Sequence, residues 1–274
     1  MEQFGPLCVG IDPHPGLLAA WGLEDSVDGL RSFSMTVVEA LGGRVSSFKP
    51  QSALFERHGS AGVKVLEDVL AASAELGTLT IVDAKRGDIG STMAGYADAY
   101  LRDGSPLAGD ALTVSPYLGF GSLTPAIELA DATGRGLFVL CLTSNPEGPE
   151  VQHARMANGT AVAKQIAVSA GQLNTAAGEL GQMGSIGLVV GATIGSAARD
   201  LDIDLAAVNG PFLAPGVGAQ GAGAAELKDV FGGARGHVLA SSSRAVLGAG
   251  PAVADLRAAA DRSIAEVTAA LFDA

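Results

Sequence analysis

The hydrophobic pattern of the chain alternates short apolar runs with longer segments that carry apolar residues at helical spacing. The apolar runs are four to seven residues long and rich in Val, Leu and Ile, as expected of strands buried on both faces. This pattern predicts eight strands. They cover residues 7–11, 45–49, 79–83, 111–114, 136–142, 186–190, 211–214 and 237–240.

The segments between these runs contain Ala, Leu, Glu and Arg with the periodicity of amphipathic helices. Eight consecutive strand-then-helix units in one chain of 274 residues predict a (β/α)8 TIM barrel, with residues 1–274 forming a single catalytic domain. An open, doubly wound sheet is the alternative. The main predicted helices cover residues 17–41, 63–76, 92–101, 124–130, 161–180 and 252–272.

Two segments depart from this regular pattern. Residues 145–159 are polar and lack periodicity, which predicts a long loop after the fifth strand. Residues 216–223 are rich in glycine and follow the seventh strand. Loops at the carboxyl ends of barrel strands often form lids and phosphate sites, so these two segments are candidates for such roles.

Composition limits the classes of partner. The formal net charge is −12, which argues against nucleic-acid or anionic-membrane partners because neither would be attracted over distance. The two cysteines, Cys8 and Cys141, lie inside apolar runs, and we see neither a signal peptide nor a membrane-spanning run, so we expect a cytoplasmic protein. The four histidines lack metal-ligand spacing, and we expect no zinc site.

Charged residues stand where apolar strands end. Asp83 and Lys85 are two residues apart, so a strand would project both side chains to the same side, at the mouth of the barrel. Lys49 and Asp12 end the second and first strands in the same way. The four could form a structural ion-pair cluster. Grouped charges are costly to desolvate, however, and their alternating signs favour a site retained for chemistry.

A second group of candidates follows strands seven and eight. The Gly-rich run Pro215-Gly-Val-Gly-Ala-Gln-Gly221 and the turn Ser241-Ser-Ser-Arg244 stand where barrel enzymes commonly bind phosphate. Arg244 offers paired donors to a phosphate, although it could also be a surface arginine on a Ser-rich turn. Asp88 precedes a helical segment and could simply cap that helix.

The motif Asp83-Ala-Lys-Arg-Gly-Asp88 resembles the catalytic motif of the orotidine 5′-phosphate decarboxylase family, and its extension to Thr92 is similar to the longer bacterial branch. The Asp-x-Lys-x-x-Asp pattern alone is shared with related sugar-phosphate decarboxylases and synthases. Further segments resemble the family in the same order along the chain. These are Gly10-Ile-Asp-Pro13, Phe48-Lys-Pro-Gln51, Thr143-Ser-Asn-Pro146, Pro215-Gly-Val-Gly-Ala-Gln220 and Ser243-Arg244.

The resemblance implies a role for each matched residue. Lys85 would supply the ammonium group beside the reacting carbon, and Asp83 would lie near the departing carboxylate. Lys49 would bridge Asp83 and the ribose, while Asp12 would contact a ribose hydroxyl. The implied reaction converts orotidine 5′-monophosphate to uridine 5′-monophosphate and CO2 in pyrimidine biosynthesis, with neither cofactor nor metal.

The resemblance also implies contacts from a second subunit. Asp88 and Thr92 would reach into the neighbouring subunit's site, which makes the expected assembly a homodimer. Ser144 would bind the amide edge of the pyrimidine; the loop beyond it is longer than in the short-chain branch. The remaining implied substrate-binding residues, mainly for phosphate, are Pro215, Val217, Gln220 and Arg244.

Three other functions remain open from the residues alone. The nearest is a metal-dependent sugar-phosphate decarboxylase or synthase on the same scaffold. A Schiff-base aldolase could use Lys49 or Lys85 as its nucleophile. A nucleotide-binding sensor without catalysis would need Arg244 and the glycines, but has no use for the Lys–Asp pairs.

Overall fold

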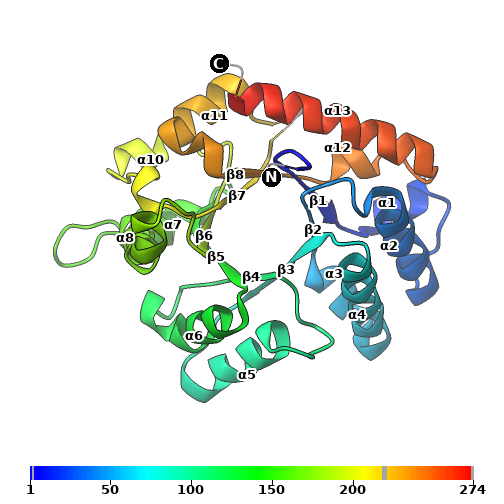
Figure 1. The fold of residues 1–274 in the computed structure, drawn as a ribbon, viewed down its shortest axis with the longest axis horizontal. Coiled ribbons are helices and arrows are strands. Elements are labelled where there is room, and N and C mark those ends of the chain that lie inside the picture. Colours follow the sequence, from blue (N-terminus) through cyan, green and yellow to red (C-terminus); the bar gives the residue numbers. More distant parts are fainter. Residues whose placement is uncertain (2, 218–220, 273–274) are drawn as a thin grey trace.

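The computed structural model describes residue 1, residues 3–217 and residues 221–272. Its eight strands are all parallel and close into a barrel in chain order, β1 pairing with both β2 and β8 (Figure 1). The closed barrel confirms the predicted (β/α)8 fold and excludes the open sheet. The strands are β1 (Leu7–Ile11), β2 (Ser47–Pro50), β3 (Leu79–Arg86), β4 (Ala111–Val114), β5 (Gly136–Leu142), β6 (Ile186–Val190), β7 (Phe212–Pro215) and β8 (Val238–Ser242).

Helices surround the strands as an outer ring (Figure 1). The last long helix, α13, packs beside α2, so the end of the described chain closes the ring next to its beginning. The α-helices are α1 (Pro15–Ala20), α2 (Val27–Leu41), α3 (Ser52–Glu56), α4 (Gly59–Glu75), α5 (Gly90–Leu101), α6 (Thr124–Thr133), α7 (Gly148–Gln152), α8 (Val162–Leu173), α9 (Thr175–Glu179), α10 (Ala197–Asp200), α11 (Ala224–Phe231), α12 (Arg244–Leu247) and α13 (Val253–Phe272). Three short 3-10 helices are η1 (Phe120–Leu123), η2 (Ala206–Val208) and η3 (Gly232–His237).

The predicted helices were wrong mainly where one continuous segment proved to be two. Residues 17–41 form α1 and α2, because Gly22 adopts a positive φ of 73° and Ser26 then caps the second helix by accepting a hydrogen bond from the Gly29 amide. Residues 161–180 divide at Asn174, whose side-chain amide donates to the carbonyls of Ile186 in β6 and Val208 in η2. The predicted loop 145–159 contains the short helix α7.

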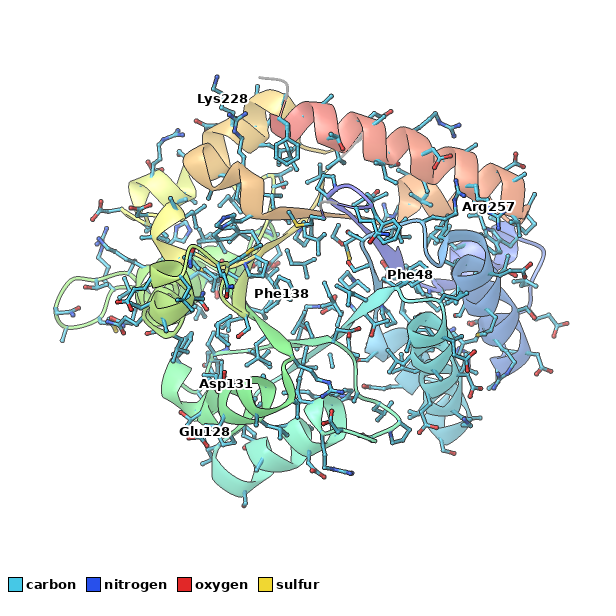
Figure 2. All side chains as sticks on the ribbon, in the orientation of Figure 1. Phe48, Glu128, Asp131, Phe138, Lys228 and Arg257 are labelled. Atoms are coloured by element: carbon cyan, nitrogen blue, oxygen red, sulfur yellow. The ribbon has the colours of Figure 1, made fainter. Side chains whose placement is uncertain are left out.

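Apolar side chains fill two layers. One set lies inside the barrel, and the other lies between strands and helices, because successive strand residues face opposite sides. Phe138 belongs to the inner set and Phe48 to the outer one, whereas exposed charged residues such as Glu128 and Lys228 lie on the outer helices (Figure 2). The inner set is Cys8, Ile81, Ala111, Phe138, Val189, Leu213 and Leu239. This filled interior leaves the barrel ends for binding.

Candidate active site

A cavity of about 650 Å³ opens at the carboxyl ends of the strands. Its walls come from β1, β2, β3, β7 and β8 and the segments that follow them, so residues far apart in the chain meet there. Most of its lining side chains are polar or charged. The lining residues are Asp12, His14, Leu17, Lys49, Gln51, Asp83, Lys85, Pro215, Gly216, Val217, Gly221, Ser241, Ser242, Ser243, Arg244 and Ala245.

The buried carboxylate of Asp83 accepts hydrogen bonds from four side chains. Its Oδ1 atom accepts from Lys85 Nζ at 2.5 Å and from Thr113 Oγ1 at 2.8 Å. Its Oδ2 atom accepts from Lys49 Nζ at 3.0 Å and from Gln51 Nε2 at 3.3 Å. Two cations and two neutral donors therefore hold the carboxylate in one orientation, despite its removal from water.

The charges alternate along the cavity wall. Lys49 Nζ lies between Asp83 and Asp12, with 3.8 Å to Asp12 Oδ1. Burial lowers the pKa of Lys49, but the charges of Asp12 and Asp83 outweigh it and raise that pKa above its usual range. For Asp83, burial raises the pKa, and the charges of Lys49 and Lys85 more than compensate, so the pKa is lowered overall. Both groups are thus held in their charged forms near neutral pH.

Lys85 occupies an unusual backbone conformation. Its φ is +48°, in the left-handed region, where an L-residue is disfavoured by about 1–2 kcal/mol. Its side chain is 44% exposed, in contrast to the 8% of Lys49, and it lines the cavity. The sequence prediction that Asp83 and Lys85 share one side is confirmed by their direct contact. Lys85 thus offers its ammonium group to a bound molecule while remaining paired with Asp83.

Asp12 connects the charged residues to the opposite wall of the cavity. Its Oδ2 atom accepts a hydrogen bond from Ser243 Oγ at 2.5 Å. Its Oδ1 atom is buried, lies 3.8 Å from Lys49 Nζ and has no hydrogen-bond partner within the described part of the chain. Arg244 directly follows Ser243 and lines the same cavity. One ligand could therefore reach both Asp12 and Arg244.

The glycine-rich loop after β7 is only partly described. Pro215 and Val217 line the cavity together with Arg244. Their implied role in substrate binding stays a prediction. Gln220 lies outside the described residues.

Three predicted site residues do not line this cavity among the residues that are described: Asp88, Thr92 and Ser144. Asp88 Oδ1 accepts from the adjacent Ile89 amide at 2.8 Å, and Ile89, not Asp88, is the N-cap of α5, so the capping interpretation of Asp88 was wrong. Thr92 is exposed on α5, and Ser144 is exposed after β5.

Sequence reasoning assigned no individual site role to Gln51, Thr113 or Ser243. Gln51 stands two residues after Lys49, and the same alternation that related Asp83 to Lys85 could have identified it. Thr113 is the one polar residue of the apolar run 111–114. Ser243 stands in the candidate turn before Arg244, but its contact with Asp12 was not predictable, because it depends on the closure of β8 against β1.

A larger cavity, of about 1010 Å³, lies at the amino-terminal end of the barrel. Its charged residues are already engaged: Arg135 pairs with Asp103, and Asp110 accepts hydrogen bonds from the amide and hydroxyl of Thr80. Apolar side chains, including Phe138 and Leu239, form much of the remaining wall. The groups suited to acid–base or electrostatic catalysis are therefore at the carboxyl end.

Neither a metal-binding cluster nor a membrane-spanning helix occurs in the described ranges. They contain no group of three or more His, Cys, Asp or Glu side chains placed to hold a metal ion. None of the helices in those ranges combines the length and apolar character needed to cross a bilayer.

The sequence matches a known protein family over most of its length. The model of the orotidine 5′-phosphate decarboxylase / HUMPS family matches residues 5–259. The orotidine 5′-phosphate decarboxylase of Salinispora arenicola is 61% identical over 271 residues, covering 99% of this chain and 95% of that protein. The enzyme of the same name from Streptomyces coelicolor is 55% identical over 271 residues, with the same coverage.

Solved structures agree with these sequence matches. A crystal structure from Streptomyces avermitilis, assigned the same enzyme name, has a TM-score of 0.94 and 59% identity, covering 99% of this chain and 93% of that one. The Leishmania donovani OMP decarboxylase has a TM-score of 0.76 and 30% identity, covering 98% and 95%. The family match, which spans most of the chain, confirms the resemblance found from the motifs. The chain belongs to the orotidine 5′-phosphate decarboxylase / HUMPS family.

Proposed function

We propose that this protein decarboxylates orotidine 5′-monophosphate to uridine 5′-monophosphate in pyrimidine biosynthesis, with residues 1–274 acting as one catalytic domain. The observation that carries the proposal is the Asp83 carboxylate held between the ammonium groups of Lys49 and Lys85, in a cavity that also contains Arg244. The relatives named orotidine 5′-phosphate decarboxylase, at 55–61% identity over nearly the whole chain, support it.

The nucleotide would lie across the cavity with its phosphate at one wall. Arg244 donates to the phosphate, aided by Gln220 and by the segment containing Pro215 and Val217. Asp12, whose Oδ1 atom accepts no hydrogen bond from any described residue, would turn toward a ribose hydroxyl and accept from it. Lys49, which lies between Asp12 and Asp83, then faces the ribose, and the pyrimidine ring extends toward the exposed ammonium of Lys85.

The chemistry requires stabilisation of a carbanion. When the C6–carboxylate bond breaks, its electron pair stays on C6 in the plane of the ring, where π delocalisation cannot reach it. The ammonium of Lys85 at about 4 Å stabilises this charge by roughly 4 kcal/mol at an effective dielectric near 20. A difficult reaction needs barrier lowering on the order of 20 kcal/mol, so preorganised charges and remote phosphate binding must contribute the rest.

Proton transfer completes the reaction. CO2 departs from the side of Asp83, and Lys85 Nζ donates a proton to C6 of the ring. The C–H bond of uridine 5′-monophosphate forms, and Lys85 is left as a neutral amine that regains a proton from water. The short Lys85–Asp83 contact fixes the position of the donor before substrate binds.

We also propose that the enzyme is a cytoplasmic homodimer in which Asp88 and Thr92 complete the partner's site. Neither residue is among the described lining of its own cavity. Beside Asp88, the large apolar side chain of Ile89 is 61% exposed and would be covered by the partner subunit in such a dimer. Ser144, exposed after β5, would bind the amide edge of the pyrimidine once substrate is present.

The test is to follow loss of orotidine 5′-monophosphate absorbance with purified protein in EDTA. Turnover that survives the chelator supports the proposal. A metal-dependent sugar-phosphate decarboxylase would instead show no activity with this nucleotide. It would act on 3-keto-gulonate 6-phosphate, and only when a divalent metal is supplied. Trapping of the protein by borohydride in the presence of a carbonyl substrate would favour a Schiff-base aldolase.

A further inference from the structure

We propose that Thr113 is a positioning residue that holds Asp83 and Lys85 in their reactive arrangement. The inference rests on the proposed function and deepens it, because it assigns to a residue on β4 the alignment of two groups on β3. Thr113 is 1% exposed and does not line the cavity. It would therefore act through its neighbours and not by touching substrate.

The Thr113 hydroxyl contacts both residues at once. Thr113 Oγ1 donates to Asp83 Oδ1 at 2.8 Å and accepts from the backbone amide of Lys85 at 2.9 Å. A hydroxyl has one proton, and the Lys85 amide is itself a donor. The proton of Thr113 must therefore point to Asp83, which fixes the direction of both hydrogen bonds.

The pairing of β3 with β4 explains why a side chain is needed here. Val82 pairs with Leu112, and pairing resumes only at Arg86 with Val114. Residues 83–85 of β3 therefore stand opposite the single residue Thr113 of β4. Such an irregularity interrupts the backbone ladder. The Thr113 hydroxyl instead accepts the hydrogen bond of the Lys85 amide, at the residue that has the positive φ.

Loss of this hydroxyl would have two linked effects. Asp83 would lose a donor that favours its charged form, which raises its pKa. The Lys85 amide would lose its hydrogen-bond acceptor. The left-handed backbone conformation of Lys85, which positions its ammonium group, would then be less stable. The other charges facing Asp83 would be unchanged: Lys85 on its own strand, Lys49 on β2, and Asp12 beyond Lys49.

The experiment compares Thr113→Val, which keeps the shape and removes the hydroxyl, with Thr113→Ser, which keeps the hydroxyl. The matched control is Thr80→Val, since Thr80 is also a buried strand threonine whose hydroxyl donates to a carboxylate, Asp110, but at the opposite end of the barrel. Readouts are kcat, the Kd of uridine 5′-monophosphate, and the pKa of Asp83 from carboxyl NMR shifts.

We expect Thr113→Val to lower kcat by about 10- to 100-fold, as for a misaligned catalytic group, with the product Kd changed by less than about 3-fold. The pKa of Asp83 should rise in Thr113→Val and stay near the wild-type value in Thr113→Ser. Thr113→Ser should retain kcat within about 3-fold, and Thr80→Val should match the wild type.

Three results would overturn the proposal: an unchanged kcat in Thr113→Val, an equal loss in Thr113→Ser, or a parallel loss of product binding. A wild-type protein that fails to decarboxylate the nucleotide would refute the proposed function instead. The pKa of Asp83 would still test the Thr113 assignment in that case, because an unchanged pKa in Thr113→Val would refute the positioning contact.

Discussion

Ser243 Oγ donates a hydrogen bond to Asp12 Oδ2 at 2.5 Å, although the two residues are 231 positions apart in the chain. The contact forms where β8 closes the barrel against β1. Gly10 leaves the space for it: a Cβ atom at that position would lie 2.0 Å from Ser243 Oγ and 2.7 Å from Asp12 Oδ2. Closure of the barrel thus joins the proposed ribose-binding residue to the segment that carries Arg244.

Gly10→Ala should disrupt this junction. The added methyl group must displace the Ser243 hydroxyl or the Asp12 carboxylate, so we expect kcat/KM for orotidine 5′-monophosphate to fall by at least about 10-fold. Steady-state kinetics with this substrate will measure kcat/KM for each variant. Gly16→Ala is the control, because a Cβ at Gly16 meets nothing within 4 Å. Equal activity of the two variants would mean that the Asp12–Ser243 contact is dispensable.

Arg244→Ala should act on phosphate binding. Removal of two charge-assisted hydrogen bonds, at about 1.5–3 kcal/mol each, should raise KM for the nucleotide by at least about 100-fold. Turnover of the nucleoside orotidine, which has no phosphate, should change little. Arg44→Ala, which removes an exposed arginine paired with Asp261, is the control. A similar loss with nucleotide and nucleoside would contradict the phosphate assignment.

Mixing two inactive variants tests the shared site. Lys85→Ala and Asp88→Asn subunits should each be inactive alone. If Asp88 acts across a two-fold interface, each mixed dimer has one intact site, so random exchange of equal amounts should restore about a quarter of wild-type activity. Activity and subunit exchange should be measured together. A mixture that exchanges subunits yet stays inactive would place Asp88 outside the partner's site.

Asp83 should make stability depend on pH. Its pKa is lower in the folded protein than the usual value near 4, so its ionised form stabilises the fold above about pH 4, and that stabilisation is lost as the pH falls through the folded pKa. The free energy of unfolding, measured with urea between pH 7 and pH 3, should therefore fall more steeply toward acid pH for the wild type than for Asp83→Asn. If the free energy of unfolding fell equally with pH in both proteins, the lowered pKa of Asp83 would be contradicted.

The strands were predictable because runs buried on both faces must be apolar over their whole length, and a charge such as Asp83 then stands out against the run that contains it. Lys49 and Lys85 were found by the same reasoning. The break between α1 and α2 was not predicted, although Gly22 and the capping residue Ser26 mark it, because apolar residues continue on both sides at helical spacing.

The remaining site residues depend on pairing between strands. Thr113 reaches Asp83 only through the shifted register of β3 against β4, and sequence periodicity within one strand does not reveal the register of another. Ser243 similarly depends on barrel closure. The roles of Asp88, Thr92, Ser144 and Gln220 stay predictions, and the mixing of subunits tests that of Asp88.

The most direct test of the central claim is to measure kcat and product affinity in Lys85→Ala. If Lys85 stabilises the carbanion and protonates it, kcat should fall by at least about 1000-fold, while uridine 5′-monophosphate binds within a few-fold of its wild-type Kd. Lys64→Ala, which removes a surface lysine paired with Asp68, should retain full activity. Undiminished turnover in Lys85→Ala would contradict the account.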